Sequence, residues 1–212
     1  MHSGGAALTI LSCDNLSHNS RLLRTVLVDY LALSFPEVIG WLDSATTFPC
    51  SMVDRIVPAM TSQQKQRQAL QLGLVDEGAV TTEPFSQWII EDRFAADRPA
   101  WDKVGAQLVE DVLPFETIKL RLLNAAHSAI AYCGLLTGME TVDEVMADPP
   151  LRSFIERLMA QELMPALDVP EGFDLGLYRD QLLERFENPC LRHRCQQIAM
   201  DGSEKILQRW LP

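Results

Sequence analysis

Residues that can transfer a proton or hold a reacting oxygen are concentrated in one short stretch of this chain. Lys119, Asn124 and His127 supply an amine, an amide and an imidazole within a run that is otherwise rich in leucine and alanine. In a regular α-helix, which turns about 100° per residue, His127 lies about 80° and Asn124 about 140° around the axis from Lys119. Glu116 lies about 60° from Lys119 on the same scale. The spacing therefore predicts four polar groups on one arc of a helix.

This arc suits proton transfer to and from an alcohol. Lys119 has apolar neighbours, and burial disfavours the charged form of an amine. A neutral lysine can act as a general base and take the proton of an alcohol while hydride leaves the same carbon. Asn124 and His127 would then stabilise the oxygen as its charge changes. The alternative is that Asn124 and His127 are hydrogen-bonded core residues without a catalytic part.

Small and apolar residues complete the expected faces of this helix. Ala131 and Gly134 fall on the polar arc, where their size would leave room beside the polar groups. Leu122, Ala126 and Cys133 fall on the other side of Lys119 and should pack into a core.

The first part of the chain has the pattern of an α/β fold. An apolar run from Leu8 to Cys13 favours a strand, Asp14 and Asn15 follow it, and helical periodicity runs from Arg21 to Ser34. Ligands of α/β sheets bind at the carboxyl ends of strands. We therefore expect Asn15 to cap the helix and also to face a ligand, although an Asx pair is more often only a cap or turn.

Two further extended runs flank a polar helix. Residues 48–58 lie between prolines, and Asp54 and Arg55 interrupt their apolar pattern, as in an exposed edge strand with a charged pair or a strand that presents Asp54 to a ligand. Residues 61–72 predict a short surface helix, and residues 80–92 predict a second strand that ends in acidic residues.

From about residue 110 the pattern is helical. It predicts a long helix, or two helices around Pro114, over residues 112–136, with Pro149-Pro150 and Pro165 as later breaks. Further helices are expected at residues 142–146, 151–167 and 175–186, followed by a mixed segment at 191–207. The predicted fold class is thus α/β plus all-α, with the change near residue 110.

Composition and missing motifs narrow the function. A net charge of -11 argues against nucleic-acid or membrane-surface binding, and no run reaches the length of a membrane span. The five cysteines lack CxxC spacing, and no signal peptide is indicated, which predicts a reduced cytoplasmic protein. The sequence has no GxGxxG, P-loop or GxSxG motif. The spacing of Cys190, His193 and Cys195 matches no ordinary zinc site, so we expect no metal.

Taken in order, these blocks resemble the mannitol dehydrogenase family, which groups long-chain polyol dehydrogenases with uronate reductases. The resemblance spans nearly the whole chain. It rests on Ser12-Cys-Asp-Asn15, Phe48-Pro, Met52-Val-Asp-Arg-Ile56, Glu83-Pro-Phe with Gln87-Trp88, Lys119-x4-Asn124-x2-His127, and Gln197-Ile-Ala-Met-Asp-Gly-Ser203 with Lys205.

The resemblance implies a Rossmann-like cofactor-binding domain followed by a helical catalytic domain. It further implies that Lys119 is the general acid/base and that Asn15 and Asn124 polarise the reacting oxygen. His127 would bind and orient the substrate, and Glu116 would line a proton path to Lys119. The expected reaction interconverts a secondary alcohol and a ketone on a small-molecule polyol or sugar acid, without metal.

The cofactor implied is NAD or NADP, with Asp54 and Asn15 near the cofactor–substrate junction. Within the family, the C-terminal sequence motifs look most like those of fructuronate reductases (mannonate oxidoreductases), and next most like those of mannitol 2-dehydrogenases. Lys205, Arg192 and Arg194 would suit a substrate carboxylate, because an arginine fork binds a carboxylate bidentately. The alternative is that both arginines lie on the solvent face of their helix.

Family members run to several hundred residues, with the Gly-rich cofactor loop upstream of the position that matches residue 1. The chain therefore looks like an internal fragment or a natural truncation. On this interpretation residues 1–110 are the C-terminal part of a Rossmann-like cofactor-binding domain, and residues 111–212 are an incomplete helical substrate and catalytic domain. A second hypothesis is a truncated, inactive paralogue that serves as a structural or interaction module.

Overall fold

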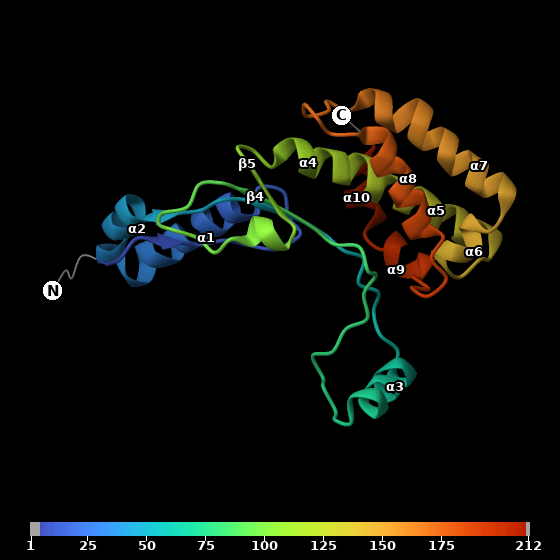
Figure 1. Ribbon diagram of the computed structural model, residues 1–212, viewed down its shortest axis with the longest axis horizontal. Helices are drawn as coiled ribbons and strands as arrows, with labels where there is room; N and C mark the ends of the chain where they lie inside the picture. Colours follow the sequence, from blue (N-terminus) through green and yellow to red (C-terminus); the bar gives the residue numbers. More distant parts are fainter. Residues whose placement is uncertain (1–4, 211–212) are drawn as a thin grey trace. The chain divides into compact units, whose positions relative to one another are not determined.

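The computed structural model describes residues 5–210 of the chain. Two compact units can be distinguished (Figure 1). The α/β unit comprises Met1–Asp54 with Ser86–Glu116, and the helical unit comprises Arg55–Phe85 with Thr117–Pro212. Each is described by itself below.

The main sheet of the α/β unit has three strands in the order β3-β4-β5. β3 (Ser51–Asp54) pairs antiparallel with β4 (Gln87–Glu91), with Ser51 opposite Ile90. β4 pairs parallel with β5 (Ala106–Val109). The core of this unit consists of buried side chains directly before β3, on β3, on β4 and after β5, namely Cys50, Met52, Ile89 and Val112.

A second, smaller sheet and two helices complete this unit. β1 (Leu8–Thr9) and β2 (Thr46–Thr47) pair in parallel, and α1 (Asn19–Ser34) and α2 (Ile39–Ala45) lie between them in sequence. The strand–helix order agrees with the α/β pattern of the sequence. The prediction that Asn15 caps α1 is wrong.

His18 occupies the cap position of α1 instead. It adopts the left-handed conformation, with φ of 53°, and its side chain makes no capping hydrogen bond. The backbone N–H of Asn15 donates to Oδ1 of Asp14, at 2.9 Å. The Asx pair therefore makes a local contact and precedes the first residue of α1 by several positions.

The first segment of the helical unit, Arg55–Phe85, contains the predicted surface helix α3 (Ser62–Leu72). Thr61 and Gln64 form a reciprocal capping box at its start, and Gly73, with φ of 71°, ends it in the left-handed conformation. No residue of α3 is buried, as its polar sequence predicts.

Helical structure is continuous from residue 113 to residue 137. α4 (Leu113–Ile118) leads into a π-helical turn, Lys119–Asn124, which leads into α5 (Ala125–Thr137). Pro114 lies in the first turn of α4, where no backbone N–H is needed, so the alternative of two helices divided at Pro114 is wrong.

The π-helical turn corrects the angles expected from a regular α-helix. A π-helix closes its hydrogen bonds between residues five apart, so residues five apart lie nearly above one another. Lys119 and Asn124 are five apart. Asn124 therefore lies closer to the face of Lys119 than in a regular α-helix, where about 140° around the axis would separate the two side chains.

The rest of the helical unit is a series of short helices. α6 (Val142–Met146) and α8 (Leu175–Phe186) match their predicted ranges. The other elements are α7 (Pro149–Arg157), a π-helical segment (Leu158–Leu163), a short 3-10 turn (Met164–Ala166), α9 (Cys195–Ala199) and α10 (Gly202–Arg209).

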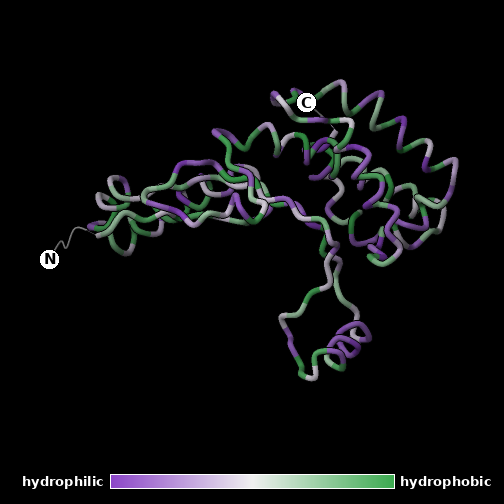
Figure 2. The backbone as a smooth tube through the Cα atoms, viewed as in Figure 1, coloured by the Kyte–Doolittle hydropathy of each residue, from purple (hydrophilic) through white to green (hydrophobic). Residues whose placement is uncertain are grey.

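The predicted break between α6 and α7 is present at residues 147–148, and Pro149-Pro150 form the start of α7. Oδ1 of Asp148 caps α7 by accepting from the N–H of Leu151, at 3.0 Å. The prolines fill the first turn, whose N–H groups have no partner within a helix. Figure 2 shows hydrophilic and hydrophobic residues alternating along the coil of α7, as in a helix with one face on a core.

α5 is the centre of the helical unit, and it packs against α6, α7 and α9 (Figure 1). Gly134 permits the approach of α9, since a Cβ there would lie 2.6 Å from Sγ of Cys195 and 2.9 Å from Cγ2 of Val145. Gly134 therefore allows α9 to pack closely against α5. The expectation that Gly134 leaves room beside the polar groups is wrong. Leu122 and Ala126 are fully buried in this core, as predicted.

In residues 5–210, no helix combines the length and the apolar character that crossing a membrane requires.

Candidate active site

The π-helical turn holds two of the predicted catalytic residues. Lys119 is buried, with 8% of its surface exposed, and Asn124 is half-buried at the end of the turn. Leu122 and Leu123 anchor the turn in the hydrophobic core. π-helical turns are uncommon and occur frequently at functional sites, because they rotate side chains away from their α-helical positions. The local structure thus places an amine and an amide near one face of a buried helix.

Arg209, at the end of α10, stabilises this turn from another helix. Its Nη1 donates to the carbonyl of Asn124, at 3.0 Å, and to Oγ of Ser128, at 2.5 Å. Burial lowers the pKa of the Arg209 guanidinium from its usual value. No sequence spacing indicates this contact, because 85 positions separate Arg209 from Asn124.

His127 lies one turn further along, enclosed by aromatic rings. Its ring centroid is 5.1 Å from that of Phe186 and 5.0 Å from that of His193, which meets it edge-on at 76°. Burial holds the pKa of His127 well below 6.5, and the nearby His193, Arg209 and Arg185 lower it further. His127 is therefore neutral at pH 7, with one nitrogen as donor and the other as acceptor.

A buried ion pair lies in the same unit. Arg185 donates to both carboxylate oxygens of Glu83, from Nε at 2.9 Å and from Nη2 at 2.7 Å. Glu83 also accepts the backbone N–H of Ile56, at 2.6 Å, and the guanidinium carbon lies 4.0 Å from the ring centroid of Phe85. Glu83 and Phe85 of the Glu83-Pro-Phe block therefore both contact Arg185. The sequence analysis did not predict a function for Arg185.

The residues expected to bind the substrate are more exposed. Nζ of Lys205 donates to the carbonyl of Ile198, at 3.2 Å. The Arg192 side chain is 66% exposed, with Nη2 3.6 Å from the Glu144 carboxylate, and Arg194 is exposed at the start of α9. The two arginines thus lie at the surface of the helical unit, which agrees with the solvent-face alternative.

Asn15, Asp54 and Glu116 belong to the α/β unit, whereas Lys119, Asn124, His127 and the substrate residues belong to the helical unit. Asn15 is exposed in the loop before α1, and Asp54, at the end of β3, is only 3% exposed. Its burial excludes the alternative of an exposed charged pair with Arg55 at this position.

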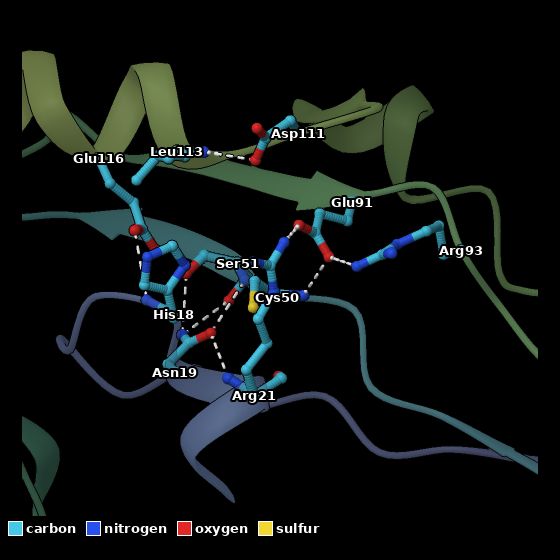
Figure 3. A network of polar contacts seen from close by, with 11 residues as sticks. His18, Asn19, Arg21, Cys50, Ser51, Glu91, Arg93, Asp111, Leu113 and Glu116 are labelled. Atoms are coloured by element: carbon cyan, nitrogen blue, oxygen red, sulfur yellow. Dashed lines mark hydrogen bonds and ion pairs between the residues drawn. The ribbon is translucent and has the colours of Figure 1, made fainter. Parts of the chain in front are cut away.

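Glu116 is a buried carboxyl group with one bonded oxygen. Its Oε2 accepts the N–H of His18, at 3.3 Å (Figure 3), and its buried Oε1 has no partner among residues 5–210. Burial raises the pKa of Glu116 from 4.5 and outweighs the hydrogen bond from His18, which lowers it. A carboxyl group whose proton is retained more readily is suited to passing a proton.

The loop that carries Asn15 is fastened by Asn19, a residue that the sequence did not single out. The Asn19 side-chain amide donates to the carbonyls of Ser12 and Asp14, both at 3.0 Å. It also donates to the carbonyl of Ser51, at 2.8 Å (Figure 3). Its oxygen accepts the N–H of Ser51, at 3.1 Å. Asn19 thereby ties the loop before α1 to strand β3.

A second buried carboxylate, Glu91, lies at the end of β4. It accepts the N–H of Cys50, at 2.9 Å, and pairs with Arg21, at 3.4 Å, and with Arg93 (Figure 3). The two arginines also line an open pocket of about 450 Å³. Its other lining residues are Arg24, Thr25, Thr46, Thr47, Phe48 and Pro49.

The part of the chain that the structure describes contains no cluster of three or more histidine, cysteine or acidic residues arranged to hold a metal ion.

Comparisons with known proteins match two family models to successive parts of the chain. Residues 1–103 match the family model of the mannitol dehydrogenase Rossmann domain, and residues 111–212 match that of the mannitol dehydrogenase C-terminal domain. The chain belongs to the mannitol dehydrogenase family. The predicted fold class, a Rossmann-like α/β part followed by a helical part, is confirmed.

Among individual relatives, D-mannonate oxidoreductase of Escherichia coli K12 is 50% identical over 208 residues, which cover 98% of this chain and 43% of that protein. A mannitol 2-dehydrogenase of Aspergillus fumigatus is 42% identical over 207 residues, covering 96% and 41%. The chain therefore spans less than half the length of these relatives.

Two solved structures are similar to this chain. D-sorbitol dehydrogenase in substrate-free form superposes with a TM-score of 0.90 at 36% identity, covering 98% of this chain and 43% of that one. Mannitol 2-dehydrogenase of Pseudomonas fluorescens, solved as a ternary complex with NAD and D-mannitol, gives 0.81 at 37% identity, covering 96% and 41%.

Proposed function

We propose that the protein containing this chain is a metal-independent, NAD(P)-dependent oxidoreductase that interconverts a secondary alcohol and a ketone on a sugar acid or polyol. The observation that carries the proposal is the arrangement of Lys119, Asn124 and His127 on one buried helix with a π-helical turn. The relatives, which include a mannonate oxidoreductase and mannitol 2-dehydrogenases, support the same reaction class.

In this proposal Lys119 transfers the proton. In the oxidation direction its amine takes the proton from the substrate hydroxyl, and in the reduction direction its ammonium returns it. The side-chain N–H of Asn124 donates to the reacting oxygen, and a negative charge there is stabilised by donors already in position. His127, held neutral by burial, orients the substrate by a hydrogen bond without adding a charge.

Glu116 and Asn15 complete the proposed set from the α/β unit. Glu116 exchanges a proton with solvent on behalf of Lys119, a part that its raised pKa and its oxygen without a partner in residues 5–210 both support. Asn15 serves as a second amide donor to the reacting oxygen, and Asn19 holds its loop in place. Asp54 lies at the cofactor–substrate junction in this assignment.

The donor set of the α/β unit fits part of a dinucleotide cofactor. The pocket with three arginines and three threonines offers guanidinium and hydroxyl donors, which suit phosphate oxygens. Arg21, Arg24 and Arg93 would hold an anionic group of the cofactor there, partly neutralised by Glu91 and Asp43. When bound, the cofactor accepts or supplies the hydride. The choice between NAD and NADP stays open in this proposal.

For the substrate, we favour a sugar acid of the mannonate type over a polyol. The 50% identity to D-mannonate oxidoreductase, against 42% to mannitol 2-dehydrogenase, supports this order. Lys205 is the cation of the helical unit that we assign to the substrate carboxylate, since it is partly buried whereas Arg192 and Arg194 are exposed.

Replacement of the proton-transfer residue tests the proposal. Lys119→Ala should lower turnover of D-mannonate or D-mannitol with NAD by about two orders of magnitude or more, the usual contribution of a general acid–base group. The assay follows NADH absorbance in the protein that contains this chain. Lys103→Ala, at an exposed lysine, is the matched control and should turn over normally.

NADH titration by fluorescence accompanies the assay. Equal NADH affinity of the wild type and Lys119→Ala separates a loss of chemistry from a loss of binding. Normal turnover of Lys119→Ala across the pH range would overturn the assignment. If the wild type neither binds NADH nor turns over either substrate, the alternative of an inactive structural or interaction module is supported instead.

A further inference from the structure

The last helix of the helical unit, α10, is held in place although none of its residues is buried. An isolated helix of this length is not stable in water, so α10 depends on specific contacts with the rest of the unit. It packs against the π-helical turn Lys119–Asn124. The contacts that hold α10 therefore act on the turn that carries two of the proposed catalytic residues.

Two of these contacts are made with Tyr132 of α5. A Cβ on Gly202, the first residue of α10, would lie 2.6 Å from the Tyr132 hydroxyl oxygen, so α10 begins directly against this side chain. Trp210, which follows α10, meets the Tyr132 ring edge-on, with the ring centroids 6.0 Å apart. Neither contact includes a residue of the π-helical turn.

Arg209, the last residue of α10, makes polar contact with the turn itself. Its Nη1 donates to the carbonyl of Asn124, at 3.0 Å, and to Oγ of Ser128, at 2.5 Å. Asn124 ends the π-helical turn and Ser128 lies in the first turn of α5, so the guanidinium bridges the junction between the two. Hydrogen bonds from a charged donor are roughly twice as strong as those between neutral groups. Arg209 therefore supplies a strong contact between α10 and the turn.

This guanidinium is committed to those two oxygens. Among residues 5–210 no carboxylate pairs with Arg209, and its buried Nε has no hydrogen-bond partner in that range. Arg185 of the same unit differs, because it is bonded to both oxygens of Glu83. Burial also lowers the pKa of the Arg209 guanidinium, which shows that the group has lost part of its hydration. Replacement of Arg209 therefore tests the bonds to Asn124 and Ser128 and breaks no ion pair.

Lys205 lies one turn before Arg209 on α10. Residues four apart on an α-helix share a face, so the two cations lie on the same side of α10. Nζ of Lys205 donates to the carbonyl of Ile198 in α9, at 3.2 Å, and an ammonium has three hydrogens to donate. α10 thus carries both the cation assigned above to the substrate carboxylate and the arginine that bonds to the π-helical turn.

We propose that Arg209 is a positioning residue, which attaches α10 to the junction of the π-helical turn with α5 and thereby fixes Lys205 relative to Asn124. Without Arg209, α10 keeps its contacts with Tyr132 but can shift along the turn. Lys205 then no longer holds a substrate carboxylate at the position that brings the reacting oxygen to Asn124. This consequence for the substrate rests on the proposed function, whereas the attachment of α10 does not, so the two are measured separately.

Hydrogen exchange followed by mass spectrometry measures the attachment in the protein that contains this chain. Arg209→Met keeps an unbranched side chain and removes its donors. The amides of residues 202–210 should then exchange at least about tenfold faster than in the wild type, because the protection of so short a helix depends on its contacts. Unchanged exchange of these amides would overturn the proposal.

A second arginine of the helical unit provides the matched control. Arg157 is exposed, and its Nε donates to the carbonyl of Ser153 within its own helix α7, at 3.3 Å. Arg157→Met therefore also removes an arginine bond to a helix carbonyl, but one that does not involve α10. It should leave the exchange of residues 202–210 unchanged.

Two milder variants address the same bonds. Ser128→Ala removes one acceptor without altering α10, and it should accelerate the same amides by about threefold, the size expected from one hydrogen bond. Arg209→Lys keeps the charge and one donor group, and it should restore part of the protection lost in Arg209→Met. If Arg209→Met does not fold, Ser128→Ala decides, since wild-type exchange in that variant would overturn the proposal.

Steady-state kinetics with NAD tests the consequence for the substrate. Arg209→Met should raise KM for D-mannonate by about tenfold or more, because a small displacement of a binding group can cost up to about a hundredfold. In a Lys205→Met background the same change should alter KM by no more than about twofold, since no cation is left to position. D-mannitol, which has no carboxylate, should respond to Arg209→Met equally in both backgrounds.

The comparison of backgrounds separates positioning from a general loss of structure. An equal rise of KM for D-mannonate in the two backgrounds would overturn the positioning of Lys205 by Arg209. Absence of turnover in the wild type would contradict the proposed function alone, and the exchange rates of residues 202–210 would still decide whether Arg209 attaches α10.

Discussion

Each unit pairs an almost fully buried glutamate with arginine, and the two pairs differ in how exposed the arginines are. Glu83 of the helical unit and Glu91 of the α/β unit are both 1% exposed, and each accepts a backbone N–H. Glu83 meets Arg185, whose side chain is 7% exposed. Glu91 meets Arg21 and Arg93, whose side chains are 54% and 55% exposed.

The two pairs differ in whether the charge of the carboxylate is still compensated when an arginine is lost. Water already reaches Arg21 and Arg93, and either one can compensate for the other. Among residues 5–210, Arg185 is the arginine that pairs with Glu83, so its loss leaves the Glu83 carboxylate as an uncompensated buried charge. The ionic centre beside His127 is therefore closed, whereas that of the α/β unit is open to solvent.

The largest expected effect separates these two pairs. Arg185→Met should lower the free energy of unfolding of the helical unit by about 3–5 kcal/mol, because it leaves the Glu83 carboxylate buried and unpaired. Arg93→Met should change stability by no more than about 1 kcal/mol, as is usual for a pair with an exposed partner. Urea titration followed by far-UV circular dichroism measures both.

A double variant serves as the control. Glu83→Gln with Arg185→Met removes both charges and should recover part of the loss seen with Arg185→Met alone. Equal losses for Arg185→Met and Arg93→Met would show that the two pairs do not differ in the way their burial indicates.

The second effect is a pH dependence of the helical unit. The folded pKa of His127 lies well below its ordinary value of 6.5, mainly because of burial. The unfolded chain therefore binds more protons below about pH 6.5, and stability falls as pH falls below that value while it is fully present above it. One such group gives a slope of at most about 1.4 kcal/mol per pH unit.

Melting curves between pH 7.5 and pH 5.5 check this prediction. His127→Asn should reduce the slope, and part of it should remain because burial also lowers the pKa of His193. Glu116, in the α/β unit, acts in the opposite direction and at lower pH, since its raised pKa adds stability to that unit that is lost as pH rises above about 4.5. A slope unchanged by His127→Asn would contradict the assignment of the proton uptake to this residue.

The features that depend on a local residue pattern could be predicted from the sequence. The order of strands and helices, the surface helix α3 and the burial of Lys119 follow from periodicity and from apolar neighbours. The π-helical turn could not be predicted in the same way, because a five-residue hydrogen bond is imposed by packing and not by a residue type.

A second π-helical segment in the same chain makes this point. Leu158–Leu163 buries only Met159 in the core and carries its polar residues at the surface, whereas Lys119–Asn124 buries an amine. The backbone form alone therefore does not mark the candidate site. What marks it is the buried polar group that the turn carries.

The remaining parts of the site depend on contacts between distant residues. Arg185 and Glu83 are 102 positions apart, and Glu116 and His18 are 98 apart. No periodicity connects such pairs, and an isolated arginine in a sequence is more often solvated than buried.

The smallest expected effect tests whether the two units open independently. Cys50 of the α/β unit and Cys195 of the helical unit are both fully buried. Burial raises the pKa of the Cys195 thiol to about 11. Alkylation at pH 8 should therefore modify the exposed Cys13 and Cys190 first, and Cys195 should react only after local opening.

Arg185→Met then sharpens the contrast between the units. It should accelerate modification of Cys195 and leave that of Cys50 unchanged, since the ion pair it breaks lies within the helical unit. Arg93→Met should leave Cys195 unchanged. Mass spectrometry of each cysteine peptide over time gives the rates. If Arg185→Met accelerates Cys50 and Cys195 equally, the units open together, and the closed ion pair stabilises the whole chain instead of one half of it.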